Sequence, residues 1–264
     1  MSGPVSSPGS GTAGSAEFSG RVALVTGGAG DGIGSATARR LGQDGASVVI
    51  VDSHEKRTRE VSERIAAETG ARVLGMAGDI ADRGRMDEIL ASTQEQLGGV
   101  DILVNNAALN VLGDVVDMDT ADWDRVMDVD LTACFYLIRQ SLPAMMSRGL
   151  GSIINVTSVA GYLGSGREGP YAASKAALHS LTRSVAFEAG PSGVRCNAVA
   201  TGIIWSKFVR KYADRMEPEI QRTPMRRIGD PEDVAELIAF LCSKRSSFIT
   251  GETINISGGW YMSP

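Results

Sequence analysis

The sequence of 264 residues predicts an α/β fold, a Rossmann-like doubly wound parallel sheet of about seven strands flanked by helices on both faces. Three observations predict it. Short runs rich in Val, Ile and Leu alternate with segments of helical length. Most of these runs are almost continuously apolar, as expected of strands that are buried on both faces. A glycine-rich loop joins the first run to the first helical segment, as in nucleotide-binding folds.

The strands and helices are expected to alternate regularly along the chain. The expected strands are residues 22–26, 47–52, 72–77, 100–105, 152–157, 194–199 and 253–256. The helical segments between them include residues 33–43, 55–69, 84–97, 121–146, 171–189 and 231–243. Pro231, directly after Asp230, is typical of a helix start, because aspartate caps the first turn and proline needs no hydrogen bond there. Such alternation favours a parallel sheet.

The first residues differ in composition from the rest. Residues 1–19 are rich in Gly, Ser and Pro, so we expect a disordered tail. They lack the basic start and apolar stretch of a signal peptide. Residues 20–264 are expected to form a single Rossmann-like domain that includes a substrate lid at about residues 203–223. No apolar run reaches the length of a membrane span.

Composition and charge exclude several function classes. The net charge of −5 argues against a nucleic-acid partner. Three dispersed cysteines, Cys134, Cys196 and Cys242, argue against a disulfide framework and a zinc site, and they suit a reducing cytoplasm. Of the two histidines, His54 is expected on the surface and His179 in helix packing. We therefore expect a cytoplasmic protein without a metal site, a membrane contact or a nucleic-acid partner.

The loop after the first strand is predicted to bind a dinucleotide. It reads Thr26-Gly27-Gly28-Ala29-Gly30-Asp31-Gly32-Ile33-Gly34. Glycines allow positive φ angles and a close approach of pyrophosphate. The helix that follows offers free N–H groups and the positive end of its dipole. No Lys-Ser/Thr pair follows the last glycine, which excludes a Walker loop.

Asp52, at the end of the second strand, is predicted to select the cofactor. It lies 18 residues after Gly34 (52 − 34), where a carboxylate accepts hydrogen bonds from the adenosine ribose and repels a 2′-phosphate. NAD is therefore expected rather than NADP. Asp31 adds a second negative charge nearby. Lys56 and Arg57 have the charge to bind a phosphate, and we interpret them as the start of a solvated helix face.

Ser158, Tyr171 and Lys175 form the candidate catalytic set. Tyr171 and Lys175 are four residues apart, which places phenol and ammonium on one helix face. The cation favours the phenolate, so Tyr171 is expected to donate or remove the alcohol proton as hydride moves. Ser158, after the fifth strand, is expected to hydrogen-bond the substrate oxygen and stabilise the charge that develops there.

Together these motifs resemble the single-domain branch of the short-chain dehydrogenase/reductase family, including the 3-oxoacyl-acyl carrier protein reductases, over residues 19–260. The matching pieces are the glycine loop, Asp52, Gly78-Asp79-Ile80, Asn105-Asn106-Ala107-Ala108, Ser158, Tyr171-x-x-x-Lys175, Thr250-Gly251 and Gly258-Gly259.

The resemblance also implies roles for these residues. It implies that Asp79 and Ile80 contact the adenine and that Asn105 and Ala107 lie beside the cofactor. It further implies that Lys175 binds the nicotinamide ribose and that Ile203 lies near the carboxamide. The full set of implied cofactor-binding residues is Gly27, Gly32, Ile33, Gly34, Asp52, Asp79, Ile80, Asn106, Ala107, Ala108, Tyr171, Lys175, Gly202 and Ile203.

Three smaller departures from the family pattern lie in loops. Four residues, rather than three, separate Gly27 from Gly32, so the pyrophosphate cradle must be reshaped. Ala108 replaces a glycine, which costs little if its φ angle is negative. Gly202 follows Thr201, where the family has a proline before the glycine.

Asp130 is the fourth departure. The family has an asparagine here that kinks the helix and holds a water linked to the lysine. We include Asp130 in the catalytic set and hypothesise that its carboxylate partly offsets the field of Lys175. Tyr171 would then be less acidic than beside an asparagine, and an unmoved acidic limb in the pH–rate profile of Asp130→Asn would contradict this. The alternative is that Asp130 is displaced and backbone alone holds the water.

The segment after Gly202 is the expected lid. Trp205, Phe208, Val209, Tyr212 and Met216 recur at helical spacing, with Lys207, Arg210, Lys211 and Arg215 largely between them. One interpretation is an amphipathic helix packed on its own core or on a neighbouring subunit. The other is an apolar pocket wall with a basic rim, suited to a bulky ketone with an anionic handle, such as an acyl-carrier or CoA thioester. Leu109, Tyr162 and Leu163 are further candidates for the pocket.

These observations predict an NAD(P)-dependent oxidoreductase that interconverts a secondary alcohol and a ketone. One alternative is an NADPH-dependent 3-oxoacyl-thioester reductase acting on acyl carrier protein or CoA esters. Another is a non-catalytic dinucleotide-binding sensor, against which the complete Ser/Tyr/Lys set argues. The resemblance further implies a homotetramer that uses the two long helices and the C-terminal segment, and the apolar stretch 131–142 is compatible with it.

Overall fold

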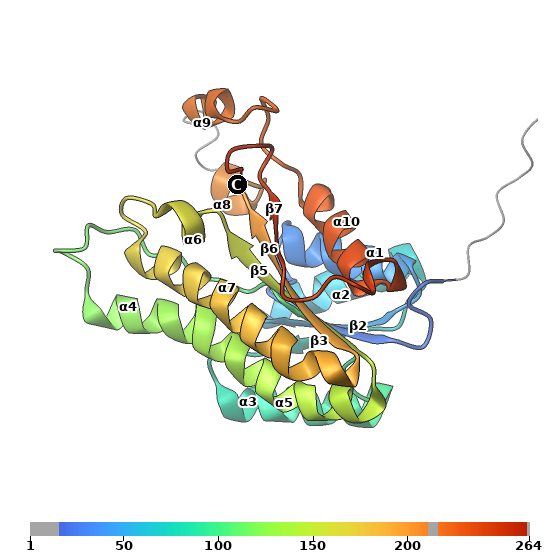
Figure 1. The fold of residues 1–264 in the computed structure, drawn as a ribbon. Coiled ribbons are helices and arrows are strands. Elements are labelled where there is room, and N and C mark those ends of the chain that lie inside the picture. Colours follow the sequence, from blue (N-terminus) through green and yellow to red (C-terminus); the bar gives the residue numbers. More distant parts are fainter. Residues whose placement is uncertain (1–15, 211–215, 263–264) are drawn as a thin grey trace, which may run out of the picture.

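The computed structural model describes residues 16–210 and 216–262 and contains one seven-stranded parallel sheet (Figure 1). The strand order is β3-β2-β1-β4-β5-β6-β7, as expected for a doubly wound sheet. The strands are β1 (Val22–Thr26), β2 (Ser47–Asp52), β3 (Val73–Ala77), β4 (Ile102–Asn105), β5 (Gly151–Ser158), β6 (Val194–Thr201) and β7 (Thr253–Ile256). The predicted fold class is therefore confirmed.

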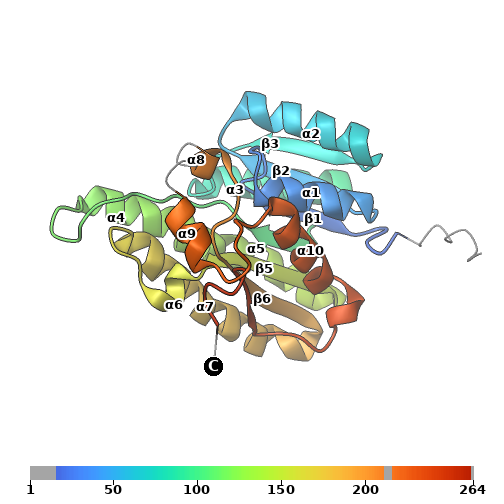
Figure 2. The same cartoon turned by 90° about the horizontal axis from the view of Figure 1, so that it is seen from above.

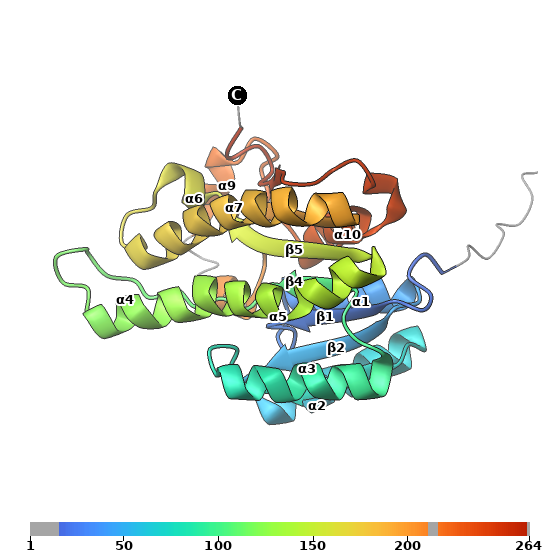
Figure 3. The same ribbon diagram turned by 60° about the horizontal axis from the view of Figure 1, so that its bottom comes forward.

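Helices cover both faces of the sheet. On one face lie α1 (Ile33–Gln43), α2 (Glu55–Thr69) and α10 (Pro231–Cys242). On the other face α3 (Arg83–Leu97), α5 (Ala133–Arg148) and α7 (Gly169–Ala189) lie side by side, as Figure 3 shows. A hydrophobic core lies between the sheet and the helices on each face, and alternate residues of β1 point into the two cores. Ala23 and Val25 pack with the first set of helices, and Val22 and Leu24 pack with the second.

Short elements gather where the strands end. They are α6 (Ala160–Leu163), α8 (Lys207–Arg210) and α9 (Glu217–Arg222). Figures 1 and 2 show α6 and α9 on the side of β5 and β6, and α8 nearer to β2. The short helices η2 (Gly190–Ser192) and η4 (Lys244–Ser246) precede β6 and β7. Within the described residues, none of the helices is both long and apolar enough to cross a bilayer.

The helix expected over residues 121–146 is not continuous, which corrects the prediction. It consists of α4 (Thr120–Met127), one turn of π-helix, η1 (Asp128–Thr132), and α5. A π turn adds one residue to the helical hydrogen-bond ring and often marks a functional position. Asp130 lies at the centre of η1, so the turn directs this buried side chain towards α7.

The boundary expected after residue 19 is also wrong. Residues 1–15 of the expected tail lie outside the described part of the chain, but Phe18 is buried in the core, with 1% of its surface exposed. Its backbone N–H donates to the carbonyl of Asp44 at 2.8 Å. A single aromatic side chain in a Gly/Ser-rich segment gives no periodic signal, and its burial depends on contacts with distant residues.

Candidate active site

The strand order reverses between β1 and β4, and the loops after these two strands meet there. The Thr26 hydroxyl accepts the backbone N–H groups of Asn106 and Ala107, at 3.0 and 3.1 Å. The Asn106 side chain donates to the carbonyls of Thr26 and Gly27, at 2.9 and 3.2 Å. Asn106 thus braces the two loops rather than pointing into open space. Ligands of open α/β sheets bind at such a reversal.

The glycine loop fits a dinucleotide phosphate. A Cβ on Gly27 would lie 2.7 Å from the Ala107 Cα, and one on Gly34 would lie 2.5 Å from the Gly27 carbonyl oxygen. Both positions therefore require glycine, and Gly27 also has a φ of +67°. At Gly30 and Gly32, by contrast, nothing lies within 4 Å of an added Cβ. This free space adjoins the N-terminus of α1, where backbone N–H groups favour an anion.

Asp52 holds the glycine loop in place. One carboxylate oxygen accepts the N–H of Ala29 at 3.2 Å, and the other accepts the N–H of His54 at 3.2 Å. Asp31, from the loop, is exposed and lies 3.8 Å from Arg64. A hollow beside them is lined by Ala29, Gly30, Asp31, Arg57, Glu60, Val61, Arg64 and Lys207. Its three cations therefore face two carboxylates.

The expected adenine contacts already have partners in the protein. One Asp79 oxygen is 2.5 Å from an Arg125 nitrogen, and the other accepts the N–H of Ala81 at 3.0 Å. The Ile80 side chain is buried in the core on the α3 side. Ala108 is exposed and does not take a positive φ, since Arg167 and Arg226 are the described non-glycine residues that do. An alanine in place of the family glycine is therefore unstrained.

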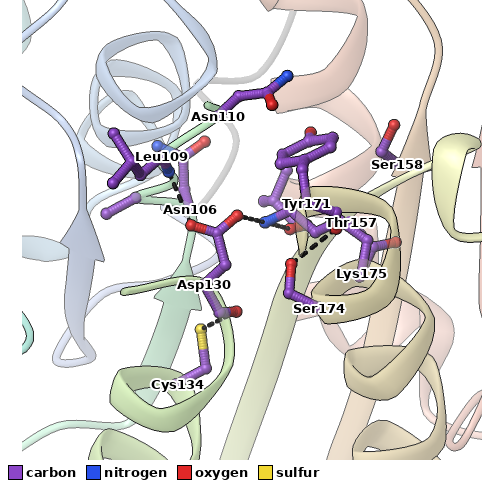
Figure 4. Close-up of polar contacts among 12 residues, drawn as sticks. Asn106, Leu109, Asn110, Asp130, Cys134, Thr157, Ser158, Tyr171, Ser174 and Lys175 are labelled. Carbon is purple, nitrogen blue, oxygen red and sulfur yellow. Dashed lines mark hydrogen bonds and ion pairs between the residues drawn. The ribbon is translucent and has the colours of Figure 1, made fainter. Parts of the chain in front are cut away.

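The catalytic candidates come from β5 and α7. Ser158 is the last residue of β5, and its hydroxyl accepts the N–H of Ala160 at 3.2 Å. Tyr171 lies in the first turns of α7, and the Lys175 ammonium is 5.3 Å from the centre of its ring. In Figure 4 the hydroxyl groups of Ser158 and Tyr171 point to the same side of Asp130. The topology thus brings together the three residues that the sequence predicts.

Asp130 and Lys175 form a buried ion pair. The Lys175 Nζ is 3.1 Å from Oδ2 of Asp130, and the two side chains are 3% and 0% exposed. The other carboxylate oxygen of Asp130 accepts the backbone N–H of Leu109 at 2.7 Å (Figure 4). Lys175 also donates to the Val156 carbonyl at 3.4 Å. The alternative in which Asp130 is displaced from the lysine is therefore wrong.

Burial and pairing act in opposite directions on this pair. Burial raises the pKa of Asp130, and the ammonium of Lys175 and the Leu109 N–H offset part of that rise. Burial disfavours the ammonium of Lys175, but the attraction of the Asp130 carboxylate at contact distance is the largest of the opposing effects that outweigh it, so the pKa of Lys175 is raised. Lys175 therefore stays an ammonium at neutral pH, held by a carboxylate at contact distance.

Gly202 and Ile203 lie beyond the end of β6. A Cβ on Gly202 would lie 2.9 Å from the Ser257 Cα, so this glycine allows close packing on the segment after β7. The Ile203 carbonyl accepts the N–H of Gly229. In the expected lid, the Arg210 guanidinium lies 5.4 Å from the Trp205 ring centre, and Lys207 is exposed. Lys211, Tyr212 and Arg215 lie outside the described residues.

An aromatic cluster near Ser158 is a feature that the sequence reasoning missed. The Tyr162 ring stacks on Tyr261 at 4.6 Å between centres and lies 4.4 Å from the His179 ring. His179 is buried against the Thr157 hydroxyl at 2.9 Å. The cluster joins the C-terminal segment to the loop after β5. Its members are distant in sequence, and no local pattern indicates that they meet.

Asn110 and Glu168 are a second missed pair. The Asn110 side-chain amide donates to the Glu168 carboxylate at 2.5 Å, which joins the loop after β4 to the start of α7. Figure 4 places Asn110 on the same side of Asp130 as the Tyr171 hydroxyl. The pair therefore fixes the loop after β4 against α7 on this side of Asp130. In the sequence, this pair is indicated only by the polar residue Asn110 shortly after the Asn105–Ala108 stretch.

Comparison with known proteins finds relatives over nearly the whole chain. A family model described as enoyl-(acyl carrier protein) reductase matches residues 28–261. A Mycobacterium tuberculosis protein, (5R,7aS)-5-hydroxy-7a-methyl-1-oxo-2,3,5,6,7,7a-hexahydro-1H-indene-carboxyl-CoA reductase, is 40% identical over 248 residues, which cover 93% of this chain and 95% of the relative. Human dehydrogenase/reductase SDR family member 4 is 37% identical over 243 residues, which cover 90% and 87%.

Solved structures share the fold over nearly the whole chain. A putative gluconate dehydrogenase from Agrobacterium tumefaciens has a TM-score of 0.89 at 30% identity, covering 93% of this chain and 98% of that one. A short-chain dehydrogenase/reductase from Brucella melitensis, described as a glucose/ribitol dehydrogenase, has a TM-score of 0.85 at 35% identity, covering 94% and 99%.

Proposed function

This chain belongs to the short-chain dehydrogenase/reductase family, and from that premise we propose that it interconverts a secondary alcohol and a ketone with NAD(H) as its preferred cofactor. Members of the family are oxidoreductases that act on carbonyl or alcohol groups with NAD(P). The sensor alternative does not fit this membership. The observation that carries the proposed roles is the buried Lys175 ammonium beside the Tyr171 ring, at the sheet edge where the glycine loop lies.

We assign the following catalytic roles to the side chains at this edge. In the oxidation direction, the Tyr171 phenolate removes the hydroxyl proton of the alcohol while the C–H bond breaks. The ammonium of Lys175 favours that phenolate. Ser158 donates a hydrogen bond to the substrate oxygen. A bound nicotinamide dinucleotide supplies the hydride acceptor, or the donor in reduction.

The residues that would hold the dinucleotide follow the two loops. We assign Gly27, Gly32, Ile33 and Gly34 to the pyrophosphate, because they surround the N-terminus of α1 and the backbone at Gly32 is open there. We assign the remaining contacts to Asp52, Asp79, Ile80, Asn106, Ala107, Ala108, Tyr171, Lys175, Gly202 and Ile203. Ile80 and Asn106 would contribute through backbone, because their side chains are engaged in the protein.

The preference for NAD rests on Asp52. Its carboxylate is fixed at the end of β2 by two backbone N–H groups, beside the glycine loop. A fixed negative charge there repels a 2′-phosphate. Arg57, Arg64 and Lys207 near the loop favour a phosphate, but Asp31 and Glu60 in the same hollow offset their charge. The ratio of kcat/KM for NADH and NADPH tests the preference, and comparable values would contradict it.

A CoA thioester reductase is the second candidate. The lid carries Lys207 and Arg210 beside Trp205, which combines a cationic rim with an apolar surface. The M. tuberculosis relative is named as a reductase of a carboxyl-CoA substrate. We infer a bulky ketone with an anionic handle as the second substrate class.

One substrate panel separates the two candidates. Free secondary alcohols and ketones are compared with acetoacetyl-CoA and a bulky ketone CoA ester, and dinucleotide absorbance is followed. Turnover of CoA esters with little turnover of the free ketones would favour the second candidate. The absence of any dinucleotide-dependent turnover across the panel would contradict both.

A further inference from the structure

The buried part of the site is electrically neutral as a unit. Asp130 and Lys175 contribute one negative and one positive charge, in contact at 3.1 Å. Burial raises the pKa of the Cys134 thiol to about 12 and lowers the pKa of His179 to about 4, so both neighbours are uncharged at neutral pH. The family pattern has a neutral asparagine at position 130, which would leave the lysine charge uncompensated. The aspartate therefore changes the net charge of this site by one unit.

The position of the carboxylate links it to the cofactor loops. Oδ1 of Asp130 accepts the N–H of Leu109, three residues after Asn106, whose side chain contacts the Gly27 carbonyl. One short loop thus runs from the glycine cradle to Asp130. On its other side, Asp130 contacts Lys175, which lies beneath the Tyr171 ring. Asp130 is therefore placed between the dinucleotide cradle and the catalytic helix.

We propose that Asp130 makes the site discriminate between the two redox states of the cofactor, in favour of the oxidised, cationic nicotinamide. This inference rests on the proposed function. The oxidised ring carries a positive charge and the reduced ring is neutral. A lone buried ammonium repels the oxidised form, whereas an ammonium already paired with a carboxylate does not. Asp130 thereby favours occupancy of the site by the oxidised dinucleotide.

Equilibrium binding tests the proposal without any need for turnover. We would measure the Kd of NAD⁺, NADH and ADP-ribose by calorimetry for the wild type and for Asp130→Asn. This variant keeps an acceptor for the Leu109 N–H and removes the charge. We expect NAD⁺ to bind roughly threefold to tenfold more weakly. NADH and ADP-ribose, which lack the positive ring, should change by less than about twofold.

Two further variants make the result specific. Glu95→Gln also removes one negative charge, but from an exposed position near the C-terminus of α3, away from the carboxyl ends of the strands. It should leave all three affinities unchanged. Asp130→Ser, a smaller replacement, should repeat the loss for NAD⁺ if Asp130→Asn does not fold.

The outcomes separate this inference from the proposed function. An equal loss for NAD⁺, NADH and ADP-ribose would mean that Asp130 only shapes the site, and unchanged NAD⁺ affinity in both folded variants would overturn the charge argument. If no dinucleotide binds the wild type, with NADP⁺ and NADPH also tried, the proposed function itself fails. If the dinucleotides bind but Asp130→Asn leaves the ratio of the Kd values for NAD⁺ and NADH unchanged, only this inference fails and the proposed function stands.

Discussion

At the scale of single residues, Asp130 is expected to set the pH dependence of turnover. Its carboxylate partly cancels the field of Lys175 at Tyr171, since it lies 3.1 Å from the ammonium. Replacing it with asparagine removes this opposing negative charge from beside the ammonium. The acidic limb of the pH–rate profile for alcohol oxidation should therefore move to lower pH in Asp130→Asn. A limb that stays in place would show that the carboxylate has no influence on the phenol.

His179 is expected to make the fold sensitive to acid. Burial, with smaller contributions from Arg183 and Lys175, lowers its pKa from 6.5 to about 4. Between these values the unfolded chain binds more protons than the folded chain, so stability is full above pH 6.5 and falls as the pH decreases towards 4.

The matched variant is His179→Gln, which keeps a polar atom near the Thr157 hydroxyl and removes the titration. The stability of the wild type relative to the variant should decrease by about 1 to 3 kcal/mol over this pH range. Chemical denaturation at several pH values measures it. Parallel pH curves for the two proteins would contradict the assignment.

At the scale of elements, the glycine loop should tolerate no side chain at Gly34. A Cβ there would lie 2.5 Å from the Gly27 carbonyl oxygen and 2.6 Å from the Asn106 amide nitrogen. Gly34→Ala must therefore push the two loops apart, and dinucleotide affinity should fall by at least roughly tenfold. Gly84→Ala, in the first turn of α3, is the control, because a Cβ there would meet its nearest neighbour, Oδ1 of Asp82, at an ordinary contact distance of 3.5 Å. An unchanged Kd for Gly34→Ala would contradict the cradle.

The elements also show what local sequence can predict. Strands β1, β2 and β7 and helices α1 and α2 have the predicted bounds, because near-continuous apolar runs and helical periodicity determine them locally. The family resemblance implies a kink at position 130, but local sequence does not predict the π turn η1, since Asp128–Thr132 has the pattern of ordinary helix and its geometry depends on packing against α7. The position of Phe18 depends in the same way on distant contacts.

The site was predictable in its chemistry but not in its contacts. Ser158, Tyr171 and Lys175 are specified by residue type and spacing, and the sheet brings them to one edge. The direct bond between Asp130 and Lys175 depends on how η1 faces α7, which no spacing rule gives. Likewise, Asn106 was expected to bind the cofactor, and nothing in the sequence indicates that its side chain joins the loops after β1 and β4.

At the scale of the whole molecule, several large apolar side chains remain exposed on the helices that cover one face. They include Trp123, Phe135 and Phe187, which are 41%, 48% and 87% exposed. Trp123 and Phe135 lie on α4 and α5, within the helix expected over residues 121–146, and Phe187 lies on α7. These are the two long helical segments that the family resemblance assigns to subunit contacts, together with the C-terminal segment. Light scattering should therefore give four times the mass of one chain. A monomer at micromolar concentration would remove this prediction.

The central claim is that the fold brings Tyr171 to the cofactor edge as the acid/base of the reaction, with Lys175 beneath it. Tyr171→Phe removes one hydroxyl and leaves the cradle intact. The most direct test of the claim is to measure kcat for the best alcohol substrate, together with the Kd of NADH, in this variant and in the wild type. We predict that kcat falls by roughly 10²- to 10⁴-fold, while the loss of one of many dinucleotide contacts raises the Kd of NADH by less than about threefold. Tyr136→Phe, which removes a phenol that binds Asp87 on the surface, should keep wild-type turnover. Near-normal turnover by Tyr171→Phe would contradict the account.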